Sequence, residues 1–249
     1  IGELHGRYIL ASETCALDLI AAEFLREVRP GEVVWVDDDG LHNAQALPAG
    51  RNALCIFEHV YFARPDSRLA GVEVHGARVR MGETLAREAP AEADLVIGVP
   101  DSGTPAAIGF SKASGIPFNE ALIKNRYVAR TFIQPDQAMR EQGIRMKFNP
   151  LHEVDGKRIV VVDDTIVRAN TTRQLVAMLQ EAGALEVHVR ISSPPVVSPC
   201  FYGIDFPDED ELPAAHRSVE EMRQLIGATS LHYLSVGGMQ EATQLPEDS

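Results

Sequence analysis

Two adjacent aspartates, Asp163 and Asp164, end an apolar run at residues 159–162 and precede a short polar turn. Carboxylates in this position can accept hydrogen bonds from vicinal sugar hydroxyls or bind a hydrated Mg²⁺ that a polyphosphate also ligates. Consecutive residues of a straight strand point to opposite faces, so the pair can serve one ligand only where the strand is already turning. Acidic strand ends are also common in α/β folds without a site. The pair nevertheless predicts a sugar or metal site at this strand end.

The residues that follow this turn, Thr171 to Gln174, fit a capping box, in which a threonine begins a helix and a glutamine follows three positions later. A threonine at a helix start is more often only a cap. However, the unpaired N–H groups and hydroxyls of a helix start can also hold a phosphate. Carboxylates alone would repel a phosphate. Aspartates for a sugar or metal, beside a helix start for a phosphate, therefore predict one sugar-phosphate site.

A second apolar run, at residues 94–100, leads into the turn Asp101, Ser102, Gly103 and Thr104. In open parallel sheets the ligand binds outside the carboxyl ends of the strands. We therefore expect Asp101 and Ser102 at the same edge as the aspartate pair.

The segment at residues 124–147 is strongly basic, with two acidic residues, Asp136 and Glu141, against six basic ones: Lys124, Arg126, Arg130, Arg140, Arg145 and Lys147. A solvated surface loop is an equally good interpretation of its charge pattern alone. However, the segment connects two predicted strands over a long stretch, and long connections in compact domains are often lids or binding loops. A lid would exclude water from a reactive pyrophosphate.

The elements that must position these residues alternate regularly from about residue 94. We expect strands at 94–100, near 116–123, at 158–163 and at 186–192, with helices at 104–115 and 171–183. Strands that are apolar on both faces and alternate with helices indicate an α/β fold with a parallel sheet covered on two sides. Before this region the pattern predicts a strand at 32–40 and a boundary or long connection at 63–71.

An amphipathic helix is predicted at residues 14–31, where the apolar positions have helical spacing and Pro30-Gly31 stops the pattern. These positions are Leu17, Ile20, Ala21, Phe24, Leu25 and Val28.

The chain has 249 residues, an apolar fraction of 45% and a formal net charge of -13. The charge disfavours nucleic acid and anionic membranes as partners, so an anionic ligand needs a local group of cations. Neither a membrane span nor a signal peptide is visible, and we expect a cytoplasmic protein. Cys15, Cys55 and Cys200 are too few and too widely spaced for a disulfide framework.

Four ordered motifs resemble the amidophosphoribosyltransferase family, also called glutamine phosphoribosylpyrophosphate amidotransferases. They are VVVDDTIVRANTT, KNRYVARTFIQP, GVPDSG and SSPPVVSPCFYGID. The resemblance covers nearly the whole chain. It implies a type I phosphoribosyltransferase fold, a mostly parallel sheet flanked by helices, at residues 56–249. A remnant of an N-terminal-nucleophile glutaminase (glutamine amidotransferase) domain is expected at residues 1–55.

The activity implied by this resemblance is that of a pentosyltransferase, which uses 5-phosphoribosyl 1-pyrophosphate (PRPP) and Mg²⁺. Ammonia displaces pyrophosphate at C1 and gives 5-phosphoribosylamine, the first step of de novo purine synthesis. The resemblance implies catalytic roles for Asp163, Asp164, Arg130 and Lys147, and Mg²⁺ at Ser102, Asp163 and Asp164. The expected PRPP-binding residues are Asp101, Ser102, Lys124, Arg126, Thr165, Ile166, Val167, Arg168, Ala169, Asn170, Thr171 and Thr172.

The phosphate loop departs from the family's usual Asp-Asp-Ser-Ile-Val-Arg-Gly-Thr-Thr-Ser at Thr165, Ala169, Asn170 and Thr172. The change from glycine to Ala169 matters most, because a left-handed backbone there is strained by a Cβ atom. Asn170 tolerates such a conformation at the next position. We expect weakened PRPP binding.

Two further departures concern the ends of the chain, which begins at Ile1 and which we expect to be a piece of a longer protein. The family's N-terminal cysteine nucleophile is absent, so we expect the chain to use ammonia only, or to be inactive, and glutamine to serve the complete protein. Cys55 and Cys200 match two of four cysteines that hold a [4Fe-4S] cluster in one family branch, and two thiolates do not complete a cluster.

Purine nucleotide inhibitors are expected to compete with PRPP, and a homo-oligomer is expected. Three alternatives stand beside the transferase. A receiver-like fold with an acidic pocket is disfavoured by the basic segment at residues 124–147. A phosphoribosyltransferase acting on a nucleobase is disfavoured by KNRYVARTFIQP. A PRPP- or nucleotide-binding regulatory module without turnover is compatible with the altered loop.

Overall fold

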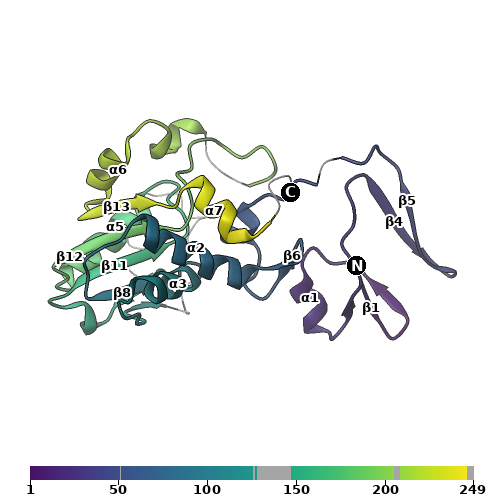
Figure 1. The fold of residues 1–249 in the computed structure, drawn as a ribbon, viewed down its shortest axis with the longest axis horizontal. Coiled ribbons are helices and arrows are strands. Elements are labelled where there is room, and N and C mark those ends of the chain that lie inside the picture. Colours follow the sequence, from purple (N-terminus) through teal and green to yellow (C-terminus); the bar gives the residue numbers. More distant parts are fainter. Residues whose placement is uncertain (51, 126, 128–146, 205–207, 246–249) are drawn as a thin grey trace. The chain divides into compact units, whose positions relative to one another are not determined.

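The computed structural model describes residues 1–50, 52–125, 127, 147–204 and 208–245 (Figure 1). The chain divides into two compact units, Ile1–Ala77 with Thr243–Ser249, and Arg78–Ala242. These units are defined by packing, whereas the predicted domains at 1–55 and 56–249 are defined by resemblance. The domain assignment stays a prediction. No helix in the described ranges has the length and apolar character needed to cross a membrane.

The first unit is built from short antiparallel strands. A three-stranded sheet has the order β2-β1-β3, and two hairpins pair β4 with β5 and β6 with β7. The predicted strand at 32–40 is confirmed as β4. The elements are β1 (Gly2–Leu4), β2 (Arg7–Ile9), α1 (Thr14–Leu19), β3 (Glu23–Phe24), β4 (Glu32–Asp37), β5 (Gly40–Gln45), a π-helical turn (Glu58–Phe62), β6 (Arg68–Leu69) and β7 (Val72–Glu73).

The predicted helix at residues 14–31 is wrong beyond its first turns, because α1 ends at Leu19. Ala21 has a positive φ of 57°, and the next residues pair as β3 with β1. Phe24 and Val28, predicted on the apolar face, are 44% and 49% exposed. Strand pairing with the chain start has overridden the helical spacing, as tertiary context often overrides local propensity.

The second unit contains a four-stranded parallel sheet of order β13-β12-β11-β8 (Figure 1). β11 lies in the centre, with Asp163 opposite Ile191 of β12 and Val162 opposite Gly98 of β8. The elements are α2 (Val74–Glu88), β8 (Leu95–Gly98), α3 (Thr104–Ser114), β9 (Leu122–Lys124), β10 (Phe148–Pro150), β11 (Arg158–Asp163), α5 (Asn170–Glu181), β12 (Glu186–Ile191), α6 (Val219–Ile226), β13 (Ser230–Tyr233) and α7 (Val236–Thr243), with 3₁₀ turns at His152–Val154, Glu209–Glu211 and Pro213–Ala215.

The expected parallel α/β sheet is confirmed, with β8, α3, β11, α5 and β12 close to the predicted ranges. The strand expected near 116–123 differs. A single parallel bridge joins Val96 to Phe118, and the regular strand β9 begins at Leu122 and pairs with β10 outside the main sheet. The helices α2, α6 and α7 and the strand β13 were not predicted.

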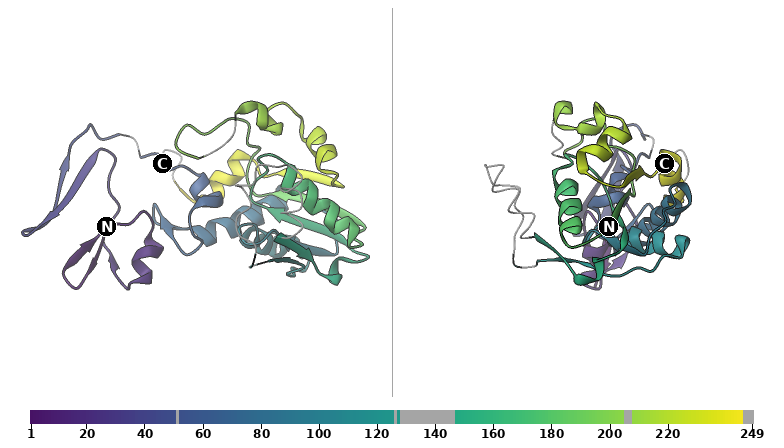
Figure 2. Two further views of the ribbon diagram at one scale, coloured as in Figure 1. Left: turned by 180° about the vertical axis from the view of Figure 1, so that it is seen from behind. Right: turned by 90° about the vertical axis from the view of Figure 1, so that its left-hand side faces the viewer.

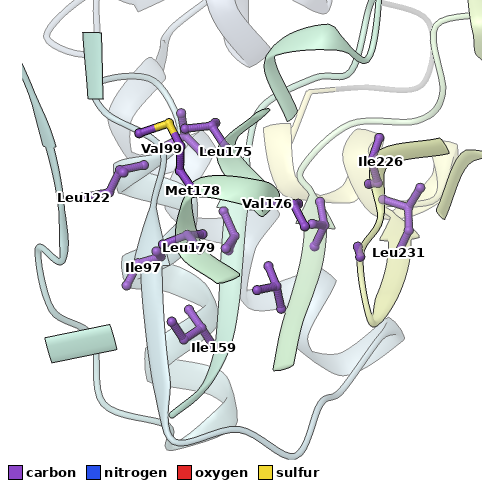
Figure 3. Close-up of a cluster of buried hydrophobic side chains, with 14 of the residues drawn as sticks. Ile97, Val99, Leu122, Ile159, Leu175, Val176, Met178, Leu179, Ile226 and Leu231 are labelled. Carbon is purple, nitrogen blue, oxygen red and sulfur yellow. The ribbon is translucent and has the colours of Figure 1, made fainter. Parts of the chain in front are cut away.

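Helices cover both faces of this sheet (Figure 2). On one face, apolar residues of β8, β11 and β12 pack against α5 and α6 in a continuous buried core (Figure 3). The buried positions Leu175, Val176, Met178 and Leu179 of α5 have the spacing of an amphipathic helix. On the other face, a Cβ atom on Gly98 of β8 would approach Thr104 and Ala107 of α3. The sheet is therefore buried on two sides, as its apolar strands require.

Arg190 of β12 joins the sheet to α2 from inside the protein. It is 2% exposed, and its guanidinium donates to the carbonyl oxygens of Ala89 at 2.8 Å and Pro90 at 3.0 Å. It also donates to Ser230 Oγ of β13 at 2.9 Å. Burial lowers the pKa of Arg190 to about 10. These bonds satisfy carbonyl groups at the end of α2, which would otherwise lack partners.

The amino ends of β8 and β11 are joined by an ion pair. Asp94 accepts hydrogen bonds from the backbone N–H of Arg158 at 2.9 Å and from its guanidinium Nη2 at 2.8 Å. The side-chain hydrogen bond from Arg158 lowers the pKa of Asp94 to about 2. Both side chains are more than a third exposed, so water screens the pair.

This depressed pKa predicts a specific pH dependence of stability. Because the folded-state pKa lies below the unfolded value, the stabilisation is present above a pH of about 4 and is lost as the pH falls from about 4 towards 2. Asp94→Asn should therefore unfold more easily than the wild type at neutral pH, and the difference should shrink across this range. Urea unfolding at several pH values measures it, with the exposed Glu92→Gln as control. A difference that does not change with pH would contradict the assignment.

Candidate active site

The predicted aspartate pair lies where β11 ends, at the carboxyl edge of the parallel sheet. Asp163 is 9% exposed and Asp164 is 5% exposed. The chain turns here, because the backbone N–H of Asp164 donates to Asp163 Oδ1 at 2.9 Å. Thr165 Oγ1 donates to Asp164 Oδ1 at 2.7 Å. Both carboxylates are thus held in a turn of the chain, which two adjacent residues need in order to serve one ligand.

Burial raises the pKa of Asp163 well above its usual range, and the adjacent Asp164 raises it further. Burial also raises the pKa of Asp164, although hydrogen bonds from Ser102 and Thr165 and the charge of Arg78 lower it. Two carboxylates forced together in a buried place repel each other, and this repulsion favours a proton or a cation at the pair. Their hard oxygen donors suit Mg²⁺.

Ser102 and Asp101 lie on the loop between β8 and α3, beside the pair. The Ser102 side chain is close enough to Asp164 to lower the pKa of that carboxyl, so the two predicted strand ends do meet at one edge. Gly103 permits this approach, since a Cβ atom there would lie 2.5 Å from Val162 O and 3.1 Å from Asp163 Cα. The loop is further held by a hydrogen bond from Val99 N to Val162 O at 2.9 Å.

Lys124 and Lys147 mark the two ends of the basic segment. Lys124 ends β9, and Asn125 N donates to the Lys147 carbonyl at 2.7 Å, so the hairpin of β9 and β10 brings both lysines together. Lys124 Nζ lies 2.5 Å from Asp101 Oδ2. Burial, and then the charge of Lys124, lower the pKa of Lys147. Four other predicted basic residues, Arg126, Arg130, Arg140 and Arg145, lie outside the described residues.

The predicted phosphate loop runs from Thr165 into the start of α5. Ile166 is buried in the core below the loop, so its backbone rather than its side chain is available to a ligand. Arg168 is exposed and pairs with Glu211 at 3.0 Å. Thr172 is buried, whereas Asn170 and Thr171 are exposed. A cavity of about 220 Å³ adjoins this helix start, lined in part by Arg168, Ala169, Asn170 and Arg173.

The predicted capping box of Thr171 and Gln174 is wrong. The N-cap of α5 is Ala169, and no side chain in the described part of the chain caps this helix start. In contrast, α6 has a complete capping box, in which Ser218 N donates to Glu221 Oε2 at 2.7 Å. The reason is that α5 begins one residue earlier than expected, which places Thr171 inside the first turn. Its first N–H groups are therefore not used by a cap.

Comparison with known proteins identifies this arrangement. A phosphoribosyl transferase domain family matches residues 80–192, which include the aspartate pair and the loop before α3. The amidophosphoribosyltransferase of Synechococcus elongatus is 59% identical over 239 residues, or 96% of this chain and 48% of the relative. The chain belongs to the amidophosphoribosyltransferase family.

Other relatives agree with this assignment. The amidophosphoribosyltransferase of Bacillus subtilis is 54% identical over 96% of this chain and 50% of its own length. A solved structure, glutamine PRPP amidotransferase from B. subtilis complexed with ADP and GMP, covers 100% of this chain and 55% of that chain, with 52% identity and a TM-score of 0.92. The chain thus spans about half the length of the curated relatives that it matches.

Ala169 has the left-handed conformation expected at this position of the amidophosphoribosyltransferase loop. Its φ is 62° and its ψ is -14°, although it carries a Cβ atom and is buried. A left-handed backbone costs a non-glycine residue about 1–2 kcal/mol. The strain inferred from the sequence therefore falls on the N-cap residue of α5.

Substitutions at Ala169 should reveal this strain. A branched side chain fits the left-handed region worst, so Ala169→Val should lower the free energy of unfolding by about 2 kcal/mol. Ala169→Gly should change it by less than about 1 kcal/mol, because relief of strain offsets the loss of a buried methyl group. Chemical denaturation measures both. Ala177→Val within α5 is the control, and a loss no larger at Ala169 than at Ala177 would contradict the strain.

The cysteines of this chain do not by themselves fit a cubane cluster. The sequence contains three, of which Cys15 is buried, Cys55 exposed and Cys200 partly buried. A [4Fe-4S] cluster needs four protein ligands. Across the described residues, no group of three or more His, Cys, Asp or Glu side chains has the arrangement of a metal site. The predicted roles of Cys55 and Cys200 stay predictions about a longer protein.

Two contributors to the site, Arg78 and Ser193, were missed from the sequence, and a third, Gly103, was placed in its turn without a role. Arg78 of α2 is 3% exposed and its charge acts on Asp164. Ser193, after β12, donates to the Asp164 carbonyl at 2.8 Å. Gly103 permits the loop contact described above. Ser193 could have been found as a polar residue at a strand end, but nothing local distinguishes Arg78 from other helical arginines.

Proposed function

We propose that this chain carries the phosphoribosyl-transfer site of an amidophosphoribosyltransferase. It transfers the 5-phosphoribosyl group of PRPP to ammonia and releases pyrophosphate. The observation that carries this proposal is the buried pair Asp163 and Asp164 at the carboxyl edge of the sheet, next to Ser102 and followed by the uncapped start of α5. Membership of the family supports it.

In the proposed site, each part of PRPP meets a different element. The aspartate carboxylates accept hydrogen bonds from the ribose hydroxyls. The loop of residues 165–172 takes the 5-phosphate, with backbone N–H groups of the α5 start as donors. Lys124 and Lys147 face the pyrophosphate, whose negative charge grows as it leaves. Arg126 stays a predicted PRPP-binding residue, and Arg130 stays a predicted catalytic residue.

In the reaction, the bond between C1 and the pyrophosphate oxygen breaks, and the pyrophosphate leaves with the bonding electrons. The ammonia nitrogen forms a bond to C1 and loses a proton to the solvent, which gives 5-phosphoribosylamine. Positive charge on the ribose in the transition state suits the neighbouring carboxylates, and the lysines stabilise the departing anion. Mg²⁺, which Asp163, Asp164 and Ser102 would hold, supplies further charge neutralisation for pyrophosphate. The protein's main contribution is positioning.

The wider assignments rest on the relatives. We assign residues 1–55 to the end of a glutamine amidotransferase domain, which supplies ammonia from glutamine in the complete protein. Purine nucleotides would compete with PRPP for the phosphate loop, and the B. subtilis structure, complexed with ADP and GMP, supports nucleotide binding in this family. A cytoplasmic location and a homo-oligomer stay predictions.

Pyrophosphate release tests the proposal. The folded chain, given PRPP, Mg²⁺ and excess ammonium, should release pyrophosphate at a rate that depends on all three. The strained Ala169 at the phosphate loop favours a second candidate, a PRPP-binding module without turnover. Saturable PRPP binding by calorimetry, without pyrophosphate release under excess ammonium, would replace the transferase with this module. No PRPP binding would reject both.

A further inference from the structure

The ion pair between Asp101 and Lys124 joins the loop after β8 to the end of β9. Lys124 Nζ lies 2.5 Å from Asp101 Oδ2. The Lys124 side chain is 45% exposed and the Asp101 side chain is 81% exposed. The residues come from different elements, 23 positions apart in the chain. The contact is therefore a tertiary one, and its exposure leaves both side chains free to exchange partners.

The lysine in this pair is one that the proposed function assigns to pyrophosphate, so the role inferred for Asp101 rests on that function. A carboxylate and a pyrophosphate oxygen are both anions that seek the same ammonium group. They cannot occupy it together without repelling each other. Asp101 cannot favour a pyrophosphate by direct contact, which revises its expected role as a PRPP-binding residue.

A second lysine, Lys147, gives the carboxylate of Asp101 a role in the free protein, because it brings a second positive charge near Lys124. Lys147 is close enough to Lys124 for the two positive charges to affect each other, and Lys147 is partly buried. With Asp101 against Lys124, the charge of Lys124 is neutralised when no ligand is present. A bound pyrophosphate would neutralise both.

We propose that Asp101 is a built-in competitor of pyrophosphate, whose carboxylate occupies Lys124 in the free protein and is displaced when the pyrophosphate group of PRPP binds. The displaced carboxylate returns to Lys124 as pyrophosphate leaves. Asp101 thereby weakens the binding of substrate and product alike and favours release of the product. No bond is made or broken in this exchange.

Affinity for inorganic pyrophosphate in the presence of Mg²⁺, measured by calorimetry, tests this role. Asp101→Asn keeps the side-chain size and removes the competing charge, so it should bind pyrophosphate more tightly. Exposed ion pairs contribute little, so the expected gain is about two- to fivefold. The gain should fall as salt is added, because screening weakens the competing pair.

A double-mutant cycle separates displacement from a general change of charge. In a Lys124→Met background, Asp101→Asn should give no gain, since there is no ammonium to compete for. Glu120→Gln, which removes an exposed negative charge four positions before Lys124, is the control and should change affinity by less than Asp101→Asn.

The outcomes distinguish the competitor role from the proposed function. If the wild-type chain binds neither pyrophosphate nor PRPP, the proposed function fails. If the wild type binds and Asp101→Asn binds equally or more weakly, only the competitor role fails, and weaker binding would instead show that Asp101 helps to hold the metal ion. A gain that persists in the Lys124→Met background would also overturn it.

Discussion

Replacing Asp163 by asparagine is expected to reduce Mg²⁺-dependent pyrophosphate release from PRPP by about 10²- to 10³-fold. The substitution keeps the shape of the side chain and its place at the end of β11, but it removes one of two buried charges at the proposed ribose and metal position. A metal ion contributes several kcal/mol of charge stabilisation, and each 1.4 kcal/mol corresponds to a factor of about ten in rate. The assay is pyrophosphate release with saturating ammonium.

The variant should remain folded, because Asp163 and Asp164 repel each other and neutralising one removes that repulsion. Its denaturation midpoint should equal or exceed that of the wild type. Asp94→Asn is a matched control, since Asp94 lies at the amino ends of β8 and β11, at the other end of the same strands. Asp94→Asn should keep its turnover. A folded Asp163→Asn that retains more than about a tenth of the activity would refute the assigned role.

The largest effect on stability is expected at Gly82, where alanine should lower the free energy of unfolding by about 3 kcal/mol. α2 and α3 approach each other at two glycines. A Cβ atom on Gly82 would lie 1.8 Å from Ala106 O, and one on Gly109 would lie 1.9 Å from Val79 O. Both obstacles are backbone carbonyls, which cannot rotate away as a side chain can. The helices α2 and α3 would have to move apart. This would disturb the helix packing on one face of the sheet.

Urea denaturation measures this loss. Gly237→Ala is the matched control, because Gly237 also lies in a helix, α7, and its added Cβ would meet Ser235 Oγ at 4.0 Å as its nearest neighbour in the described structure. Gly237→Ala should be neutral or slightly stabilising, since alanine reduces the freedom of the unfolded chain. Equal effects at Gly82 and Gly237 would show that the helices do not meet as closely as the structure has them.

Much of the second unit could be predicted because its signals are local. The apolar run before Asp163, the polar turn and the spacing of Leu175, Val176 and Leu179 all lie close together in the chain. Parallel strands buried on both faces also force their carboxyl ends to one edge. The meeting of Ser102 with Asp164 is a consequence of this rule.

The predictions that failed concern where helices begin and end. The helical spacing at residues 14–31 lost to pairing of β3 with the chain start, and the helix expected from Thr171 begins at Asn170, so its capping box does not form. Propensity and pattern are weak preferences that packing can override. Neither outcome is encoded in the residues immediately around it.

The sequence by itself determined the residues of the proposed site, which are the aspartate pair and the following loop with Ala169 in place of glycine, and the family to which the chain belongs. These depend on residue types at short, ordered spacing. Only the tertiary structure decided that Arg78 lies buried near Asp164, that Gly82 and Gly109 let α2 and α3 touch, and that Asp101 holds Lys124. Such contacts arise from the packing of distant elements, whose distances no local pattern records.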